Sequence, residues 1–346
     1  MKQKILIIAL LLCSFFFLFL NAAPLSNDNF KNEPLISVGL WTGQTSVFVS
    51  ADDKFSIIDK SNRKTIATYE AKTRVIVSIK AGKIYLDSNK CESNNIEVVL
   101  KNYSEDKSIE VNRKNYRGNI EISNNKGLAV INILPLEEYL YSIVAGEMSP
   151  SWPQEALKAQ AVAARTYALN EINKHVNEGF NVCPTTHCQV YGGKNVEDIR
   201  AITAVDDTKG LVLYSNGKLI TAVFHSASGG YTENSEEVWG SYLPYLRAVP
   251  DYDQNSPNYK WEKKLTALEI QQKIIAAGYN IGKLQAIEIS PLKSYGKNSN
   301  DRSAVGRIKN ISFIGDANTV MLSGAKARTI LGLNSTLFDI SIVVPA

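Results

Sequence analysis

An alanine-rich segment behind an apolar run restricts the fold more than any other feature of this chain. Residues 143–147 read IVAGE, and Pro153 then begins the sequence PQEALKAQAVAARTYALN. Proline is tolerated at the start of a helix, and alanine is the strongest helix former. Apolar residues recur at the spacing of one buried helical face: Leu157, Ala161, Ala164 and Ala168. The sequence therefore predicts a helix to about Val176 with a buried face that neighbours can approach closely.

A β-rich region precedes this helix. From Leu35 to about Ile122, short alternating or β-branched runs such as SVFVS, RVIVSI and KIYLD are separated by turn residues. The chain has 346 residues, which is enough for one large domain or two ordinary ones. We expect an α+β fold. A β-rich region at 35–126 would precede a domain at 127–346 with a mixed or antiparallel sheet and the long helix.

The C-terminal third carries clear local signals. Asn216-Gly217 separates KGLVLYS from KLITAVFHS and predicts a hairpin. Thr266 and Glu269 form a capping box before a helix. RIKNISFIG and NTVMLSG read as paired strands, AKARTILGL as a short helix, and LFDISIVV as a last strand.

The N-terminus predicts export. Lys2 and Lys4 precede an apolar run at 5–20, and small residues follow at 21–23. The run is at the short edge of the roughly 17–25 residues that span a bilayer. Residues 1–23 are therefore expected to be a signal peptide or, as the alternative, a membrane anchor, with a linker at 24–34. Any membrane contact would use this segment, and the net charge of +4 does not indicate a nucleic-acid partner.

A short loop concentrates metal-binding side chains. Cys183, His187 and Cys188 lie close together, and His175 precedes them at the predicted end of the long helix. Two thiolates and two imidazoles match a closed structural zinc site, which leaves no open position for a water molecule. The alternatives are a disulfide between Cys183 and Cys188 or two free thiols. With Cys91, three cysteines follow the apolar N-terminal run, and an odd number argues against a simple disulfide framework.

Glu147 is the first candidate for chemistry. It ends the apolar run IVAG and is followed by Met148. Such surroundings strip water from a carboxyl group and favour its neutral form, which a general acid requires. The alternative is a helix cap or a surface acid.

A second polar loop, FHSASGGYTENSEEVWG, spans residues 224–240. A Ser-His-acid arrangement is disfavoured because His225 and Ser226 are neighbours, and adjacent side chains of a strand point to opposite faces. The functional interpretation is a glycan-binding loop. The alternative is a polar turn with its own capping network.

Several blocks in the same order resemble the stage II sporulation protein D family (SpoIID/LytB). They include EALKAQAVAARTYAL, THCQVYGG, SASGGYTENSEEVWG and LPYLRAVPDYD, and the resemblance covers about residues 127–342. It implies a peptidoglycan lytic transglycosylase that cleaves the MurNAc-GlcNAc β-1,4 bond and forms 1,6-anhydro-MurNAc, in sporulation or cell-wall remodelling. Glu147 falls on the catalytic glutamate. Ser149-Pro150 departs from the family pattern, in which proline often follows the methionine directly.

The resemblance also implies substrate-binding positions and a metal. The positions that fall on family motifs are Lys158, Gln160, Arg165, Gln189, Tyr191, His225, Ser226, Ser228, Glu233 and Trp239. Some members carry zinc on cysteines and histidines of the same loop, which agrees with the zinc interpretation above. We expect a catalytic cleft lined by Glu147 and the loops at 189–191 and 225–239.

Two other functions remain open. Some relatives are described as amidase enhancers, so the chain would then be a non-catalytic glycan-binding partner of an N-acetylmuramoyl-L-alanine amidase. A zinc hydrolase is the third interpretation, and the closed ligand set disfavours it. In the transglycosylase and enhancer interpretations, the partner is the peptidoglycan glycan strand.

Overall fold

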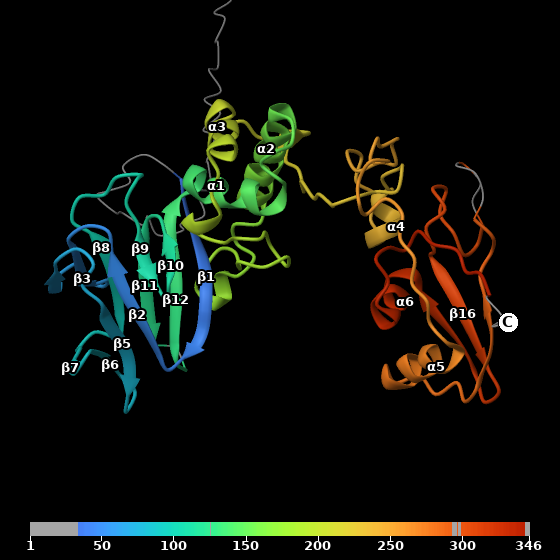
Figure 1. The fold of residues 1–346 in the computed structure, drawn as a ribbon, viewed down its shortest axis with the longest axis horizontal. Helices are drawn as coiled ribbons and strands as arrows, with labels where there is room; N and C mark the ends of the chain where they lie inside the picture. The colour runs from blue at the N-terminus through green and yellow to red at the C-terminus, as the bar shows by residue number, and fades with distance from the viewer. Residues whose placement is uncertain (1–33, 125, 293–295, 297–298, 343–346) are drawn as a thin grey trace, which may run out of the picture. The chain divides into compact units, whose positions relative to one another are not determined.

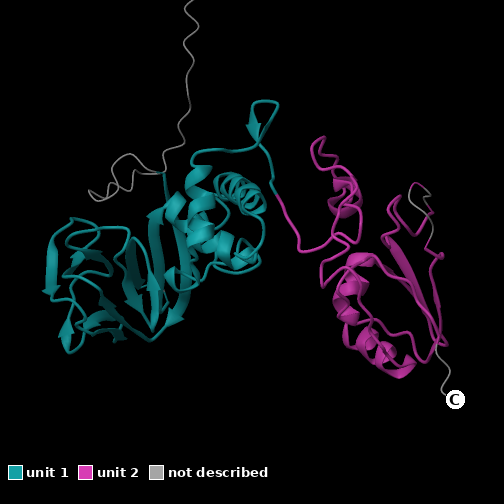
Figure 2. Cartoon of the chain, turned by 45° about the horizontal axis from the view of Figure 1, so that its top comes forward, with its two compact units in different colours: residues 1–222 teal, residues 223–346 magenta. Residues whose placement is uncertain are grey.

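The computed structural model describes residues 34–342 except 125, 293–295, 297 and 298. The expected signal or anchor segment at 1–23, and the linker apart from Pro34, lie outside these residues. The chain forms two compact units, which divide between Ala222 and Val223 (Figure 2). The predicted domain boundary at 126/127 falls within a hairpin of the first unit, whereas the division between the units lies further along the chain.

The first unit is built on two six-stranded sheets (Figure 1). In sheet order, the first consists of β1 Leu35–Gln44, β12 Leu128–Pro135, β11 Asn119–Asn124, β8 Asn95–Leu100, β3 Phe55–Asp59 and β4 Thr65–Tyr69. The second consists of β10 Lys114–Tyr116, β9 Ile109–Val111, β2 Ser46–Ala51, β5 Val75–Lys80, β6 Lys83–Leu86 and β7 Asn89–Lys90. Buried side chains of both sheets join one apolar core, so the predicted β-rich region is confirmed.

Three α-helices complete this core. They are α1 Leu136–Glu147, α2 Gln154–Asn170 and α3 Ile199–Asp207, with short 3-10 turns η1 Val176–Glu178 and η2 Lys194–Val196. The helix α1 follows β12 directly, because Pro135 is both the last residue of β12 and the N-cap of α1, and its φ of −55° suits the start of a helix. The predicted apolar stripe of α2 is confirmed, since all four of its residues are fully buried. Among the described helices, none is both long and apolar enough to cross a bilayer.

The helix α2 ends at Asn170 rather than near Val176 as predicted. The chain then turns, and the Asn181 side chain donates a hydrogen bond to the Ile172 carbonyl at 2.7 Å. The His175 N–H also donates to the Asn181 carbonyl, at 3.3 Å. These bonds to Asn181 replace helical ones and direct His175 toward the cysteine loop, which a continuing helix would not do.

A small hairpin ends the first unit. Its strands are β13 Tyr214–Ser215 and β14 Lys218–Leu219, which are shorter than the predicted runs. Between the two strands, Asn216 has a φ of 51° and Gly217 a φ of 74°, as the predicted two-residue turn requires.

The second unit has its own antiparallel sheet and apolar core. Its elements are α4 Ser235–Trp239, α5 Ala267–Ala276, β15 Leu284–Glu288, β16 Asn310–Gly315, β17 Thr319–Ser323 and α6 Gly324–Leu331. The capping box of Thr266 and Glu269 is confirmed, as is the pairing of β16 with β17. Antiparallel sheets combined with helices confirm the α+β class.

The predicted last strand is wrong for the described residues, which continue to Ile342. Side chains bind this segment instead of a neighbouring strand: Arg302 donates to the Phe338 carbonyl at 3.0 Å, and Ser335 accepts the Leu337 N–H at 3.0 Å. Backbone groups used in this way cannot form a ladder.

Candidate functional site

Glu147 is the last residue of α1, and its side chain is half-buried. Its Oε1 accepts a hydrogen bond of 2.7 Å from the Val190 backbone N–H. Gly146 permits this contact, because a Cβ at that position would lie 3.0 Å from the Val190 carbonyl oxygen. Among the described residues, no group forms a hydrogen bond with Oε2. The carboxylate is therefore fixed through one oxygen, while the other is available for chemistry.

The segment that carries Val190 is attached along α1. Tyr139 donates to the Gln189 side-chain oxygen at 3.0 Å, and the Gly192 N–H donates to the Ser142 hydroxyl at 3.0 Å. Tyr191 donates to Asn132 on β12 at 2.6 Å. Tyr139, Ser142 and Glu147 of α1 thus bind residues 189–192, so the segment is attached to α1 at several points.

Gln189 and Tyr191 were predicted to contact substrate, but both are buried. Gln189 is 1% exposed, and its amide also donates to the Ala164 carbonyl at 3.3 Å. Tyr191 is 7% exposed and stacks on Tyr139 with ring centroids 5.3 Å apart. In this structure both residues support the Val190 segment, and neither presents a surface to a sugar.

The predicted residues on α2 also differ in exposure. Arg165 is 1% exposed and binds Glu137 with Nε and Nη2, so it connects α2 to α1 in the core. Gln160 is buried, and its side-chain nitrogen has no hydrogen-bond partner among the described residues. Lys158 is half-buried and lies 3.1 Å from both Glu155 and Asp207.

The four predicted metal ligands come together. His175, Cys183, His187 and Cys188 place their ligand atoms within 4.8 Å of one another, and both cysteines are free thiols, so the disulfide alternative is not formed. The His175 Nε2 to His187 Nδ1 distance is 3.3 Å. Sulfur-to-nitrogen distances are 3.5 Å for Cys183–His187, 3.4 Å for Cys188–His175 and 3.8 Å for Cys188–His187.

These separations fit a tetrahedral ion. Zinc bond lengths to nitrogen and sulfur imply N···N edges of about 3.4 Å and N···S edges of about 3.6 Å. The other ring nitrogen of His175 lies 2.6 Å from the Glu178 carboxylate, an outer contact typical of metal-bound histidine. The cluster could therefore hold a metal ion, with all four positions supplied by the protein.

The two thiols have unequal proton affinities. At Cys183, burial raises the pKa, but hydrogen bonds involving Thr185, His187 and Cys188 outweigh it and lower the pKa to about 6. At Cys188, burial is the leading cause and raises the pKa to about 11. One thiolate therefore already exists near neutral pH, and ion binding would displace the second proton.

In the second unit, the backbone of the polar loop surrounds a carboxylate. Three successive N–H groups, those of Ser228, Gly229 and Gly230, donate to the Asp253 carboxylate at 2.7, 2.8 and 2.9 Å. Burial raises the pKa of Asp253, but these hydrogen bonds lower it overall. Asp253 was missed as a partner of the loop, although it lies in the block LPYLRAVPDYD, because chain distance does not reveal such a pairing.

The other predicted residues of this loop are distributed differently. Glu233 accepts hydrogen bonds from the Asn234 N–H at 2.8 Å and from the Ser303 hydroxyl. His225 and Ser226 are exposed, and Trp239 is 56% exposed. Glu147 and this loop belong to different units, and the expected cleft between them stays a prediction.

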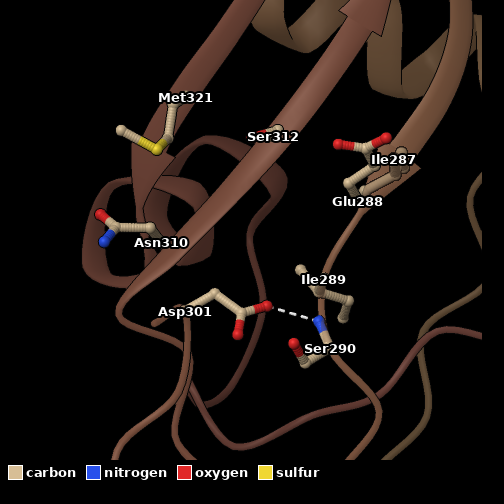
Figure 3. Close-up of a pocket in the computed structure, with 8 residues that line it drawn as sticks. All are labelled: Ile287, Glu288, Ile289, Ser290, Asp301, Asn310, Ser312 and Met321. Atoms are coloured by element: carbon tan, nitrogen blue, oxygen red, sulfur yellow. Dashed lines mark hydrogen bonds between the residues drawn. The ribbon is translucent and has the colours of Figure 1, made fainter. Parts of the chain in front are cut away.

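A pocket in the second unit is lined by none of these predicted residues (Figure 3). Its lining consists of Ile287, Glu288, Ile289, Ser290, Asp301, Asn310, Ser312 and Met321. Burial raises the pKa of Asp301, but hydrogen bonds from Ser299 and Ser290 lower it to about 2. This carboxylate is therefore ionised and already bound, so it is a support for the loop.

Comparison with known proteins finds a family match for the region around Glu147. Residues 124–214 match the SpoIID family, described as stage II sporulation protein. This match includes α1, α2, the Val190 segment and all four cluster residues. This region is a SpoIID-family domain.

Three relatives extend the match. Stage II sporulation protein D of Bacillus subtilis is 36% identical over 242 residues, which cover 64% of this chain and 64% of that protein. The amidase enhancer of Bacillus subtilis is 34% identical over 236 residues, which cover 67% of this chain and 31% of that protein. An uncharacterized protein of Brachyspira hyodysenteriae is 37% identical over 180 residues, or 52% and 49%. The matched residues thus span from about a third to just under two thirds of the length of these relatives.

Proposed function

We propose that this chain is an exported peptidoglycan lytic transglycosylase with Glu147 as its single catalytic carboxyl group. The observation that carries the proposal is the state of that side chain. It is half-buried, Oε1 is held by the Val190 N–H at 2.7 Å, and among the described residues Oε2 has no hydrogen-bond partner. Export through the N-terminal segment would bring the protein to the cell wall, in sporulation or in wall remodelling.

The other carboxylates of α1 and α2 are engaged elsewhere. Glu137 is bound by Arg165, the buried Glu138 accepts a hydrogen bond from Tyr103, and Glu155 pairs with Lys158. Glu147 differs because its partner is a backbone N–H, which orients the carboxyl group without neutralising it by a cation. A glycosidase that uses water needs two carboxylates, whereas an intramolecular displacement needs only one.

The reaction follows from that single group. Protonated Glu147 gives its proton to the oxygen that joins C1 of MurNAc to GlcNAc, and the C1–O bond breaks. The resulting carboxylate takes the proton of the C6 hydroxyl of the same MurNAc, whose oxygen bonds to C1. The products are a GlcNAc with a free hydroxyl and 1,6-anhydro-MurNAc. No water is consumed, and Glu147 regains its starting proton.

We also propose that the cysteine–histidine cluster holds a zinc ion. Two sulfur and two nitrogen ligands suit zinc, and an ion held by four protein ligands has a structural role. Since Cys188 directly precedes Gln189, an ion there would fix the start of the segment that carries Val190. The protein's own contribution is to orient Glu147 through that segment.

The decisive experiment compares Glu147→Gln with the parent protein on purified glycan strands without stem peptides. The parent should release fragments with 1,6-anhydro ends, which mass spectrometry distinguishes from hydrolysis products by the loss of one water. Glu147→Gln should lower the rate by about 10²–10⁴-fold. Glu70→Gln, which alters an exposed carboxylate on the N-terminal sheet, should retain full activity. Anhydro ends at the parent rate from Glu147→Gln would contradict the proposal.

A second candidate is a non-catalytic glycan-binding enhancer of an amidase. It is supported by the likeness to a protein named amidase enhancer over 67% of this chain. In that case the purified chain would produce no new glycan ends alone, but would raise the rate at which an added N-acetylmuramoyl-L-alanine amidase removes stem peptides. Both measurements on the same preparation separate the two functions.

A further inference from the structure

The connection between α1 and α2 presents an indole to solvent. The Trp152 side chain belongs to a residue that is 46% exposed, and the backbone N–H of Trp152 donates to the Ser149 carbonyl at 3.0 Å, which closes a turn. Pro150 lies inside this turn, and Pro153 follows it with φ fixed at −54°. Prolines restrict the backbone of the turn before and after a ligand binds, so binding costs little conformational entropy.

A second element holds the same turn. The Arg200 guanidinium donates to the Trp152 carbonyl at 3.0 Å, and the Gln154 side chain donates to the Arg200 carbonyl at 3.1 Å. Ile199, the first residue of α3, is 71% exposed. An indole, an aliphatic side chain and a guanidinium therefore occupy one firmly held part of the surface.

This surface lies within reach of Glu147. Two residues of extended chain cover at most about 7 Å, and the ends of a β-turn lie within about 7 Å. Trp152 Cα is consequently no more than about 14 Å from Glu147 Cα, a span that a few sugar units of a glycan strand can bridge.

We propose that Trp152 is a stacking position for one sugar ring of the glycan strand, beside the bond that faces Glu147. The apolar C–H face of a pyranose in a β-1,4-linked strand matches the flat indole, and contact removes both from water. Ile199 extends the apolar surface, and the guanidinium of Arg200 supplies donors for sugar oxygens. This inference rests on the proposed function, in which Trp152 is a positioning residue that sets the register of the strand and takes no part in proton transfer.

The test measures binding separately from cleavage. In the Glu147→Gln background, a soluble β-1,4-linked N-acetylglucosamine hexamer is titrated by calorimetry. Trp152→Ala should weaken binding about tenfold, which corresponds to about 1.4 kcal/mol. Trp152→Tyr should retain affinity within about threefold, because a ring remains. Tyr214→Ala removes an exposed aromatic side chain, 62% accessible, from the same unit and should leave binding unchanged.

Further measurements protect the interpretation. If Trp152→Ala fails to fold by circular dichroism, Trp152→Leu keeps the apolar bulk without the ring and should also bind about tenfold more weakly. With Glu147 present, Trp152→Ala should raise KM and leave kcat nearly unchanged. Unchanged affinity in the folded Trp152 variants would overturn this inference even if Glu147→Gln abolished cleavage. Cleavage by Glu147→Gln would overturn the proposed catalysis, while the affinity loss at Trp152 would still stand.

Discussion

Two loops, one in each unit, donate backbone hydrogen bonds to a carboxylate, and the two carboxylates are left in different states. Asp253 accepts three N–H bonds, from Ser228, Gly229 and Gly230, which use both of its oxygens. Glu147 accepts one, from Val190, through a single oxygen. A carboxylate enclosed by several donors stays ionised and holds a loop. A carboxylate held at one oxygen keeps its orientation and leaves the other oxygen open to a ligand.

The largest expected effect is a loss of stability when the Asp253 carboxylate is replaced. Asp253→Asn should lower the free energy of unfolding of the second unit by about 3–4 kcal/mol, because hydrogen bonds to the charged group are lost and an amide nitrogen faces N–H donors. Glu147→Gln should change stability by under about 1 kcal/mol, since one neutral bond can persist. Urea unfolding followed by tryptophan fluorescence measures both. Equal destabilisation by the two variants would mean that Glu147 also serves mainly to hold a loop in place.

A third carboxylate, on the same helix as Glu147, sharpens the comparison through pH. Burial raises the pKa of Glu138 to about 7, although the hydrogen bond from Tyr103 and the charge of Arg117 lower it. The unfolded value is about 4.3. Protonation is therefore favoured by the folded state, so this contribution to stability is complete below about pH 4.3 and is lost as the pH rises through 7.

The magnitude follows from that shift. Between pH 4 and pH 8, Glu138 should reduce the free energy of unfolding by up to about 3 kcal/mol, and Glu138→Gln should remove this part of the pH dependence. Urea titrations of the parent and the variant at both pH values give the difference. If the two proteins lose stability in parallel over this range, Glu138 does not titrate as the structure implies.

Metal removal tests the support of the Val190 segment. With free zinc at about 100 times Kd, binding should stabilise the folded chain by about 2.7 kcal/mol. Chelation should therefore lower Tm and increase hydrogen exchange at the Val190 amide. Cys183→Ser should lose the bound metal, whereas Cys91→Ser, at a buried thiol outside the cluster, should keep one ion per chain. Metal content is measured by mass spectrometry.

The smallest expected effect comes from a substitution beside Glu147 that keeps its carboxylate but shifts the hydrogen-bond partner. In Gly146→Ala, the new Cβ would lie 3.0 Å from the Val190 carbonyl oxygen, so the loop must shift by a few tenths of an ångström. We expect about a tenfold loss of kcat, equal to about 1.4 kcal/mol, with little change in Tm. Ala159→Ser, at an exposed position of α2, is the control. Unchanged kcat together with an unchanged Val190 amide signal by NMR would argue that this contact does not orient Glu147.

Local signals predicted much of the fold. The four-residue apolar stripe of α2, the Asn216-Gly217 turn and the Thr266–Glu269 capping box were all confirmed, because each depends on residues within one turn or helix. The end of α2 was predicted too late, and the final strand was predicted where side chains from Arg302 and Ser335 bind the backbone. Both errors come from side-chain bonds to the backbone that periodicity does not reveal, such as Asn181 to Ile172 and Arg302 to Phe338.

The sequence by itself determined which residues are candidates for the chemistry: a lone glutamate after an apolar run, and two cysteines with two histidines in and before one loop. Only the tertiary structure decided how they are used. It buried Gln189, Tyr191 and Arg165 as supports, brought His175 to the cysteines, and left one oxygen of Glu147 unbonded among the described residues. The reason is physical. Residue type fixes which atoms can donate, accept or ligate, whereas burial and partnership depend on segments that meet only after folding.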